Sequence, residues 1–272
     1  MKEPTMSTVV ITGAASGMGA ALAAELSGAG HRVIGVDLAG TRVTADLATA
    51  RGRRHALERI GALSGGTFDG FVPFAGLAAA TGRAGSLMAS VNYFGAVRLL
   101  EGLRPALARS PESPAAVLVS SNSATCQPGW PVELAEACLA GDEERARALA
   151  DRHGGVAAYP ATKAALAWYV RERAGSPEWV GSGIRLNAVA PGLIDTPMTA
   201  AGRTDPLTAD GMAAYPVPLG RPGRPAEITA AVRFLLSPAA SFCVGTVLCA
   251  DGGTEALLRP RHWPARWDPP AG

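Results

Sequence analysis

The sequence predicts an α/β protein, a single Rossmann-type domain in which helices cover both faces of a doubly wound parallel sheet. Short, nearly apolar, β-branched runs recur along the chain, as expected of strands buried on both faces. Most of these runs are separated by segments with helical spacing, and alternating strands and helices indicate a parallel sheet. The first run also leads directly into a glycine-rich turn. Strands are expected at residues 8–11, 32–36, 70–74, 116–120, 184–189 and 246–249.

Helix signals follow the first strands. Between Gly17 and Gly30, Leu22, Leu26 and Ala29 fall on one face, and Gly30 stands where a helix commonly ends. The region after the second strand repeats this pattern before a pair of glycines. We therefore expect strand–helix–strand units at the beginning of the chain.

Composition limits the classes of function. The 272 residues are 48% hydrophobic and 18% charged, which suits one large core and a single catalytic domain over 1–272. A formal net charge of +2 argues against nucleic acid as a partner. Four scattered cysteines favour reduced thiols in the cytoplasm, and no apolar run is long enough to span a membrane. The four histidines lack ligand spacing, so we expect surface positions and no metal.

Three segments depart from the alternating pattern. Residues 128–155 carry Glu143 and Arg147 at helical spacing and are interpreted as an inserted helical hairpin. Residues 197–225 are rich in Pro, Gly, Met and Thr, and are interpreted as a flap over a substrate. The proline-rich residues 259–272 are expected to form an irregular C-terminal tail.

The glycine-rich turn, Thr12–Gly19, predicts a dinucleotide site. Glycine lets a backbone turn sharply and approach a pyrophosphate, whose charge the N-terminus of the next helix stabilises. A plain tight turn is the alternative to this interpretation. The turn residues expected to contact a cofactor are Gly13, Ser16, Gly17, Met18 and Gly19.

An acidic residue near the end of the second strand indicates which dinucleotide is bound. Asp37 follows the glycines by about 20 residues, the spacing at which an acid accepts from the adenosine ribose hydroxyls. The same carboxylate would repel a 2′-phosphate. We therefore expect NAD rather than NADP, with Leu38 beside Asp37 in the site; Arg32 and Arg42 are the nearest basic candidates for the opposite interpretation.

A second pattern predicts acid–base chemistry. Tyr159 and Lys163 are four residues apart, so on a helix they share one face. A nearby cation favours a phenolate, and we expect Lys163 to lower the pKa of Tyr159. An ordinary amphipathic helix pair is the alternative.

Five features in order resemble the short-chain dehydrogenase/reductase superfamily. They are the glycine turn, Asn92 in Ser90–Tyr93, Ser120-Ser121 at a strand end, the Tyr-x-x-x-Lys pair and Asn187–Gly192. The likeness runs from Val9 to Gly253. It implies an enzyme that interconverts an alcohol and a carbonyl compound by hydride transfer with a nicotinamide cofactor.

The resemblance also implies a role for each residue. Tyr159 would be the acid and base, Ser121 would hold the substrate oxygen, and Lys163 would bind the nicotinamide ribose. Asn92 would fix a water through which Lys163 exchanges protons. Since side chains alternate along a strand, only one of Ser120 and Ser121 can face the pocket. Further cofactor contacts are implied for Asp46, Leu47, Ala75, Gly76, Pro191, Gly192, Ile194 and Thr196.

One stretch departs from the superfamily pattern. Where the family usually has Asn-Asn-Ala-Gly, this chain has Pro73–Gly76. The small residues remain, but the hydrogen bonds of an asparagine are missing, which puts cofactor affinity in doubt.

Within the superfamily the chain is most similar to the bacterial 3α-hydroxysteroid dehydrogenase/carbonyl reductase group. Shared features include Ala45–Ala50 and the long insert before Tyr159. In that group the insert covers the helices through which other members form tetramers. The resemblance thus implies a homodimer through the C-terminal helix and last strand, with a homotetramer as the alternative.

Apolar residues near the expected site favour an apolar small-molecule substrate, such as a hydroxysteroid or terpenoid, although the same residues could be plain packing. A reductase of sugars or polyols is the alternative enzyme, and a dinucleotide-sensing protein without turnover is the alternative outside enzymes. The expected lining residues are Cys126, Trp130, Val132, Met198, Leu207, Met212, Tyr215 and Val217.

Overall fold

A seven-stranded parallel sheet forms the centre of the molecule, seen in a computed structural model that describes residues 7–267. The strand order is β3-β2-β1-β4-β5-β6-β7, so the direction of winding reverses between β1 and β4. In such a sheet ligands bind at the carboxyl ends of the strands near the reversal. The strands are β1 (Thr8–Thr12), β2 (Arg32–Asp37), β3 (Val43–Thr44), β4 (Gly70–Pro73), β5 (Ala115–Val119), β6 (Arg185–Pro191) and β7 (Val247–Ala250).

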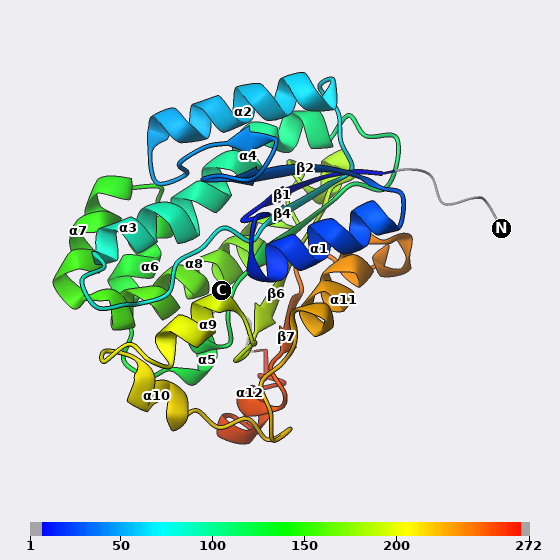
Figure 1. The fold of residues 1–272 in the computed structure, drawn as a ribbon. Helices are drawn as coiled ribbons and strands as arrows, with labels where there is room; N and C mark the ends of the chain where they lie inside the picture. The colour runs from blue at the N-terminus through cyan, green and yellow to red at the C-terminus, as the bar shows by residue number, and fades with distance from the viewer. Residues whose placement is uncertain (1–6, 268–272) are drawn as a thin grey trace, which may run out of the picture.

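Helices cover both faces of the sheet (Figure 1). On one face α1 packs against α11, and on the other α2 packs against α4 with α8 beside them. Each face has its own buried apolar cluster, which explains why strands such as β5 are apolar at every position. These helices are α1 (Gly17–Gly28), α2 (Ala50–Ser64), α4 (Ala96–Leu107), α8 (Gly155–Arg173) and α11 (Pro225–Leu236).

The predicted fold class is therefore confirmed, and all six expected strands are present within one or two residues. The strand β3 was missed, because two residues are too short to show alternation or an apolar run. It extends the sheet beyond β2 through Val36 and Asp37, which pair with Val43 and Thr44.

The insert forms a helical hairpin of α6 (Val132–Leu139) and α7 (Glu143–His153), packed against α8. Although Glu143 and Arg147 stand at helical spacing, both side chains reach across to the main fold. Glu143 accepts hydrogen bonds from the Arg53 guanidinium of α2 at 2.6 and 3.1 Å, and Arg147 donates to Ser90 Oγ at 2.6 Å. Asp142 is the N-cap of α7 and its side chain accepts from the Arg145 amide, so the hairpin is capped as well as anchored.

Short helices surround the carboxyl ends of the strands (Figure 1). Two of them lie in the expected flap, where Thr196 caps α9 by accepting from the Thr199 amide. Residues 259–267 contain no helix or strand, and the end of the expected tail lies outside the described residues. Over residues 7–267 no helix is both long and apolar enough for a membrane span. The remaining short elements are α3 (Gly85–Met88), the π-helical turn η1 (Ala89–Gly95), α5 (Ser123–Cys126), η2 (Val180–Ser182), α9 (Pro197–Gly202), α10 (Ala209–Ala213), η3 (Pro238–Ala240) and α12 (Thr254–Leu258).

Candidate active site

A pocket of about 420 Å³ lies where the sheet reverses direction, against the turn between β1 and α1. Its volume is within the range of small-molecule and cofactor sites. Most of the residues expected to contact a cofactor line it, so segments far apart in the sequence meet here. Those residues are Gly13, Ser16, Gly17, Met18, Gly19, Asp37, Leu38, Asp46, Leu47, Ala75, Gly76 and Thr196.

The glycine turn is closely packed at two positions. Gly13 has φ +68°, and a Cβ there would lie 2.6 Å from the Ala75 nitrogen. A Cβ on Gly19 would lie 2.1 Å from the Gly13 carbonyl oxygen. The backbone therefore carries no side chain at Gly13 and Gly19, where β1 ends and α1 begins. This glycine cradle fits a pyrophosphate at the N-terminus of α1.

Asp37 is held at the rim of this pocket by two backbone amides. Its carboxylate accepts from Ala15 N at 3.0 Å and from Leu38 N at 2.7 Å. These bonds connect the end of β2 to the glycine turn and fix the direction of the negative charge. The arrangement suits recognition of vicinal ribose hydroxyls.

The departure at Pro73–Gly76 has a structural compensation. Thr12 Oγ1 accepts from the Ala75 amide at 3.1 Å, and the Phe74 amide donates to the Thr12 carbonyl. The loop after β4 is therefore tied to β1 without an asparagine, while the Phe74 side chain lines the pocket.

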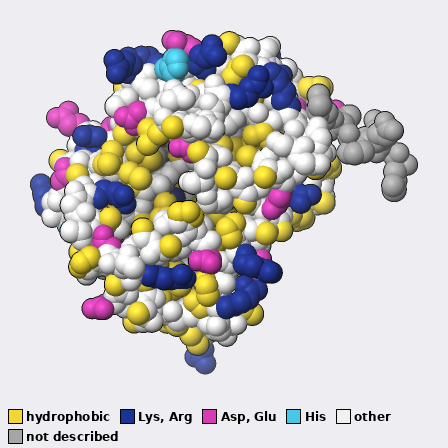
Figure 2. All heavy atoms as spheres, viewed as in Figure 1, with side chains coloured by type: hydrophobic (Ala, Val, Ile, Leu, Met, Phe, Trp, Pro, Cys, Tyr) yellow, Lys and Arg dark blue, Asp and Glu magenta, His cyan; other side chains and the backbone are white. Residues whose placement is uncertain are grey.

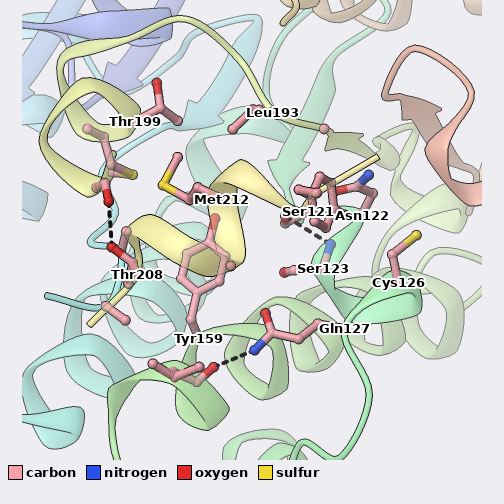
Figure 3. Close-up of a pocket in the computed structure, with 18 of the residues that line it drawn as sticks. Ser121, Asn122, Ser123, Cys126, Gln127, Tyr159, Leu193, Thr199, Thr208 and Met212 are labelled. Atoms are coloured by element: carbon pink, nitrogen blue, oxygen red, sulfur yellow. Dashed lines mark hydrogen bonds between the residues drawn. The ribbon is translucent and has the colours of Figure 1, made fainter. Parts of the chain in front are cut away.

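A second pocket of about 420 Å³ adjoins the first and contains the expected reactive residues. Figure 2 shows a recess bordered largely by hydrophobic side chains on the face in view, and Figure 3 shows Ser121 and Tyr159 on the pocket wall. Tyr159 and Gly192 line this pocket, and the flap supplies Met198, Leu207 and other side chains. The remaining expected lining residues found there are Cys126, Met212 and Tyr215.

The two serines at the end of β5 point in different directions, as strand alternation requires. Ser120 Oγ donates to the Lys163 carbonyl at 2.7 Å and is directed into the α8 contact. Ser121 lines the pocket and its Oγ accepts from the Ser123 amide at 3.2 Å. Ser121 is therefore the serine available to a ligand.

Tyr159 and Lys163 lie one turn apart on α8, with Lys163 Nζ 5.8 Å from the centre of the Tyr159 ring. Burial raises the pKa of Tyr159, and the hydrogen bond with Ser121 opposes this effect. Burial lowers the pKa of Lys163 to about 8, and its Nζ donates to the Val119 carbonyl at 2.9 Å. Desolvation of the buried phenol therefore dominates the pKa of Tyr159, and the lowering by Lys163 stays a prediction.

Asn92 lies in the π-helical turn η1 and braces the loop after β4. Its Oδ1 accepts from Leu77 N at 2.7 Å, and its Nδ2 donates to Leu77 O at 3.0 Å. A longer contact of 3.4 Å joins Nδ2 to Thr162 Oγ1 on α8. Asn92 thus lies between the β4 loop and the helix that carries Tyr159 and Lys163. A π-helical turn at such a position is common at functional sites.

Several expected residues lie outside both pockets. Ile194 and Val217 line a separate cavity of about 200 Å³, and Pro191 ends the buried strand β6. Trp130 packs against Trp168 with ring centres 5.6 Å apart and donates to the Ala124 carbonyl. Val132 begins α6 with an exposed side chain. Trp130, Val132 and Val217 therefore do not line the substrate pocket as expected, because Trp130 packs against Trp168, Val132 is exposed and Val217 lines the separate cavity.

Sequence reasoning missed lining residues that carry no motif. Arg83, Leu87 and Val91 line the cofactor pocket, while Asn122 and Gln127 line the substrate pocket. Asn122 lies just after the end of β5 and Gln127 follows the short helix α5, so proximity to the carboxyl end of this strand could have marked Asn122 as a site residue. The other three follow a loop whose path no local pattern predicts.

The glycine cradle of the dinucleotide-binding type adjoins an apolar pocket that contains a buried tyrosine and a serine. This combination is typical of the oxidoreductase class. Comparisons with known proteins agree. A family model described as "Enoyl-(Acyl carrier protein) reductase" matches residues 145–255. The "3-alpha-hydroxysteroid dehydrogenase/carbonyl reductase" of Comamonas testosteroni is 41% identical over 95% of this chain and 100% of its own length. "Galactitol 2-dehydrogenase (L-tagatose-forming)" of Cereibacter sphaeroides is 44% identical over 35% of this chain and 36% of its own.

A solved structure is also similar. The 3-alpha-hydroxysteroid dehydrogenase of Pseudomonas sp. B-0831, complexed with NADH, superposes with a TM-score of 0.89 at 44% identity, covering 94% of this chain and 99% of that one. The chain belongs to the short-chain dehydrogenase/reductase family. It is an oxidoreductase that uses a nicotinamide dinucleotide and acts on a small molecule, which excludes the interpretation as a sensing protein without turnover.

Proposed function

We propose that the protein interconverts an apolar secondary alcohol and its ketone, with a hydroxysteroid or terpenoid as the substrate class. The observation that supports this most is the second pocket, in which Ser121 and Tyr159 stand among mainly apolar side chains. An apolar wall with few polar groups binds a hydrocarbon skeleton and orients one oxygen. The relative from Comamonas testosteroni and the neighbour from Pseudomonas carry hydroxysteroid names, which favours the same class.

Four side chains would hold the substrate oxygen, transfer its proton and support the site. Ser121 donates to or accepts from the substrate oxygen and holds it beside Tyr159. Tyr159, kept as a neutral phenol by burial, donates a proton as a carbonyl becomes an alcohol and takes one back in the reverse reaction. Lys163, one turn away on α8, would hold the nicotinamide ribose. Asn92, which accepts from Leu77 N, would help fix a water through which Lys163 exchanges protons. The bound dinucleotide supplies or accepts the hydride.

For the cofactor we propose NAD rather than NADP, because Asp37 lines the cofactor pocket at the end of β2 and its carboxylate would repel a 2′-phosphate. The glycine cradle, Asp46, Leu47, Ala75 and Gly76 would hold the adenosine half. Gly192 and Thr196 would flank the nicotinamide half. Pro191 and Ile194 would act behind them by fixing the backbone after β6.

A reductase of sugars or polyols is the second candidate. One observation favours it: galactitol 2-dehydrogenase matches part of this chain. A polyol needs several polar partners, however, and the flap contributes the apolar side chains of Met198, Leu207 and Met212 to the pocket wall. The apolar substrate class is therefore the better fit.

For assembly we propose a homodimer through β7 and α12. The hairpin α6–α7 packs against α8 and η1 and covers that side of the molecule. Large apolar side chains are exposed near the other end, among them Phe242, Val244, Leu248 and Leu257. Such a patch is typical of an interface. We also place the protein in the cytoplasm, since all four cysteines are free thiols.

Initial rates of NADH oxidation with a panel of ketones test the substrate class. Steroid, terpenoid and monocyclic ketones are compared with ketoses at equal concentration, followed by absorbance at the NADH band. We expect kcat/KM to be at least tenfold higher for the apolar ketones. A preference for ketoses would support the second candidate and refute the first.

A further inference from the structure

Two hydroxyls in the substrate pocket lack a hydrogen-bond partner. They are Ser123 Oγ and Tyr215 Oη, both buried, and both residues line the pocket that holds Ser121 and Tyr159. Buried hydroxyls in native proteins are nearly always paired, because an unpaired one loses its hydration without a hydrogen bond in return. Two of them in one ligand pocket therefore need an explanation.

The geometry of Ser123 leaves its hydroxyl to a ligand. Its amide donates to Ser121 Oγ at 3.2 Å, and its carbonyl accepts from Gln127 N at 3.0 Å. The main chain is thus fixed at both sides, while the side chain is only 8% exposed. Figure 3 shows the Ser123 hydroxyl directed toward the side of the pocket where Tyr159 lies.

Tyr215 approaches from the flap, on the chain that follows α10. Burial and then the neighbouring Cys126 raise the pKa of Tyr215, so its hydroxyl stays protonated and can donate. Cys126 and Asn122 lie near Tyr215 Oη, but neither meets hydrogen-bond geometry with it, so the hydroxyl remains without a partner.

We propose that Ser123 and Tyr215 bind a second oxygen of the substrate, in addition to the oxygen held by Ser121 and Tyr159. This rests on the proposed function and narrows its substrate class to cyclic alcohols and ketones that carry another hydroxyl or carbonyl group. A site built to hydrogen-bond such a group discriminates against analogues without it, because the buried hydroxyls are then left unpaired.

The test compares cyclohexanol with 1,2-, 1,3- and 1,4-cyclohexanediol as substrates with NAD, by initial rates of NADH formation. For at least one diol, kcat/KM of the wild type should exceed that for cyclohexanol by about tenfold, beyond the statistical factor of about two for two equivalent hydroxyls. One hydrogen bond of about 1.4 kcal/mol corresponds to a tenfold change. Ser123→Ala and Tyr215→Phe should each lower this ratio by roughly five- to tenfold.

Two controls separate recognition from structure. Thr208 lines the same pocket, but its hydroxyl already donates to the Gly202 carbonyl at 2.8 Å, so Thr208→Val should leave the diol ratio unchanged. Ser120→Ala removes a paired hydroxyl and should lower Tm, whereas Ser123→Ala removes an unpaired one and should not.

A wild-type ratio near the statistical value, or equal ratios in wild type and Ser123→Ala, would overturn the second oxygen site while leaving the proposed function intact. Failure of the wild type to oxidise any alcohol would refute the proposed function instead. Binding of the diols to the NADH complex, followed by NADH fluorescence, then decides the oxygen site. Equal affinity of wild type and Ser123→Ala for every diol would overturn it.

Discussion

Replacing Asp37 by asparagine should weaken the preference for NAD over NADP. The substitution removes one negative charge at the rim of the cofactor pocket and keeps the shape of the side chain. The asparagine amide can still accept one of the two backbone hydrogen bonds, from Ala15 N or Leu38 N, that hold Asp37 in place. The glycine turn should therefore persist.

The magnitude follows from the charges. A phosphate monoester carries about −1.5 to −2 charges at neutral pH. Like charges about 4 Å apart cost roughly 1–4 kcal/mol per unit pair between the dielectric of water and that near a protein surface. Asp37 lies at a partly exposed rim, so we take the lower part of this range, about 2 kcal/mol. This corresponds to roughly a 30-fold change in relative specificity.

The assay measures kcat/KM for NADH and NADPH with one saturating ketone. The wild type should favour NADH, and Asp37→Asn should reduce the NADH/NADPH ratio about 30-fold. Asp46→Asn is a matched control, because Asp46 lines the same pocket and accepts from Ala48 N at 3.0 Å. Its ratio should change less than about threefold. A wild type that favours NADPH, or an unchanged ratio in Asp37→Asn, would refute the reasoning.

Three further substitutions probe the fold and the cradle. Glu143→Gln leaves the buried Arg53 guanidinium without a countercharge and should lower the free energy of unfolding by about 2 kcal/mol in urea titrations; equal stability would count against the anchor. Gly19→Ala places a Cβ against the Gly13 carbonyl and should raise the Kd for NADH at least tenfold in fluorescence titrations, whereas an unaltered Kd would exclude the cradle. Burial raises the pKa of Cys138 to about 12, so the wild type loses about 1 kcal/mol of stability per pH unit through this thiol between pH 9 and 11. The loss should be smaller in Cys138→Ala, and parallel pH profiles would contradict it.

Much of the fold could be predicted, because the signals were local. A strand such as β5 is apolar at every position, and the turn between β1 and α1 needs bare backbone where Gly13 and Gly19 stand. Each of these requirements involves only a few residues that are neighbours in the sequence. The same holds for Ser121, whose direction followed from strand alternation relative to Ser120.

Packing between residues far apart in the chain could not be predicted from the sequence. Glu143 pairs with Arg53 of α2 rather than with its helical neighbour, and Trp130 packs against Trp168 rather than lining the pocket. Both outcomes depend on where the hairpin α6–α7 folds back. The two-residue strand β3 was also too short to leave a periodic signal.

The direction of the Tyr159 pKa shift could not be predicted from the sequence either. Sequence spacing places Lys163 on its helix face, but the degree of burial decides whether charge or desolvation dominates the pKa. Burial is a property of the whole fold. It raises the pKa of Tyr159 and so favours the neutral phenol, a form that suits proton donation to a carbonyl.

The most direct test of the account is ketone reduction by Tyr159→Phe, measured by NADH absorbance alongside NADH binding. Phenylalanine keeps the ring and removes only the hydroxyl that is proposed to transfer the proton. We expect kcat to fall by at least a hundredfold, with the Kd for NADH within about threefold of wild type. Turnover near the wild-type rate would contradict the central claim.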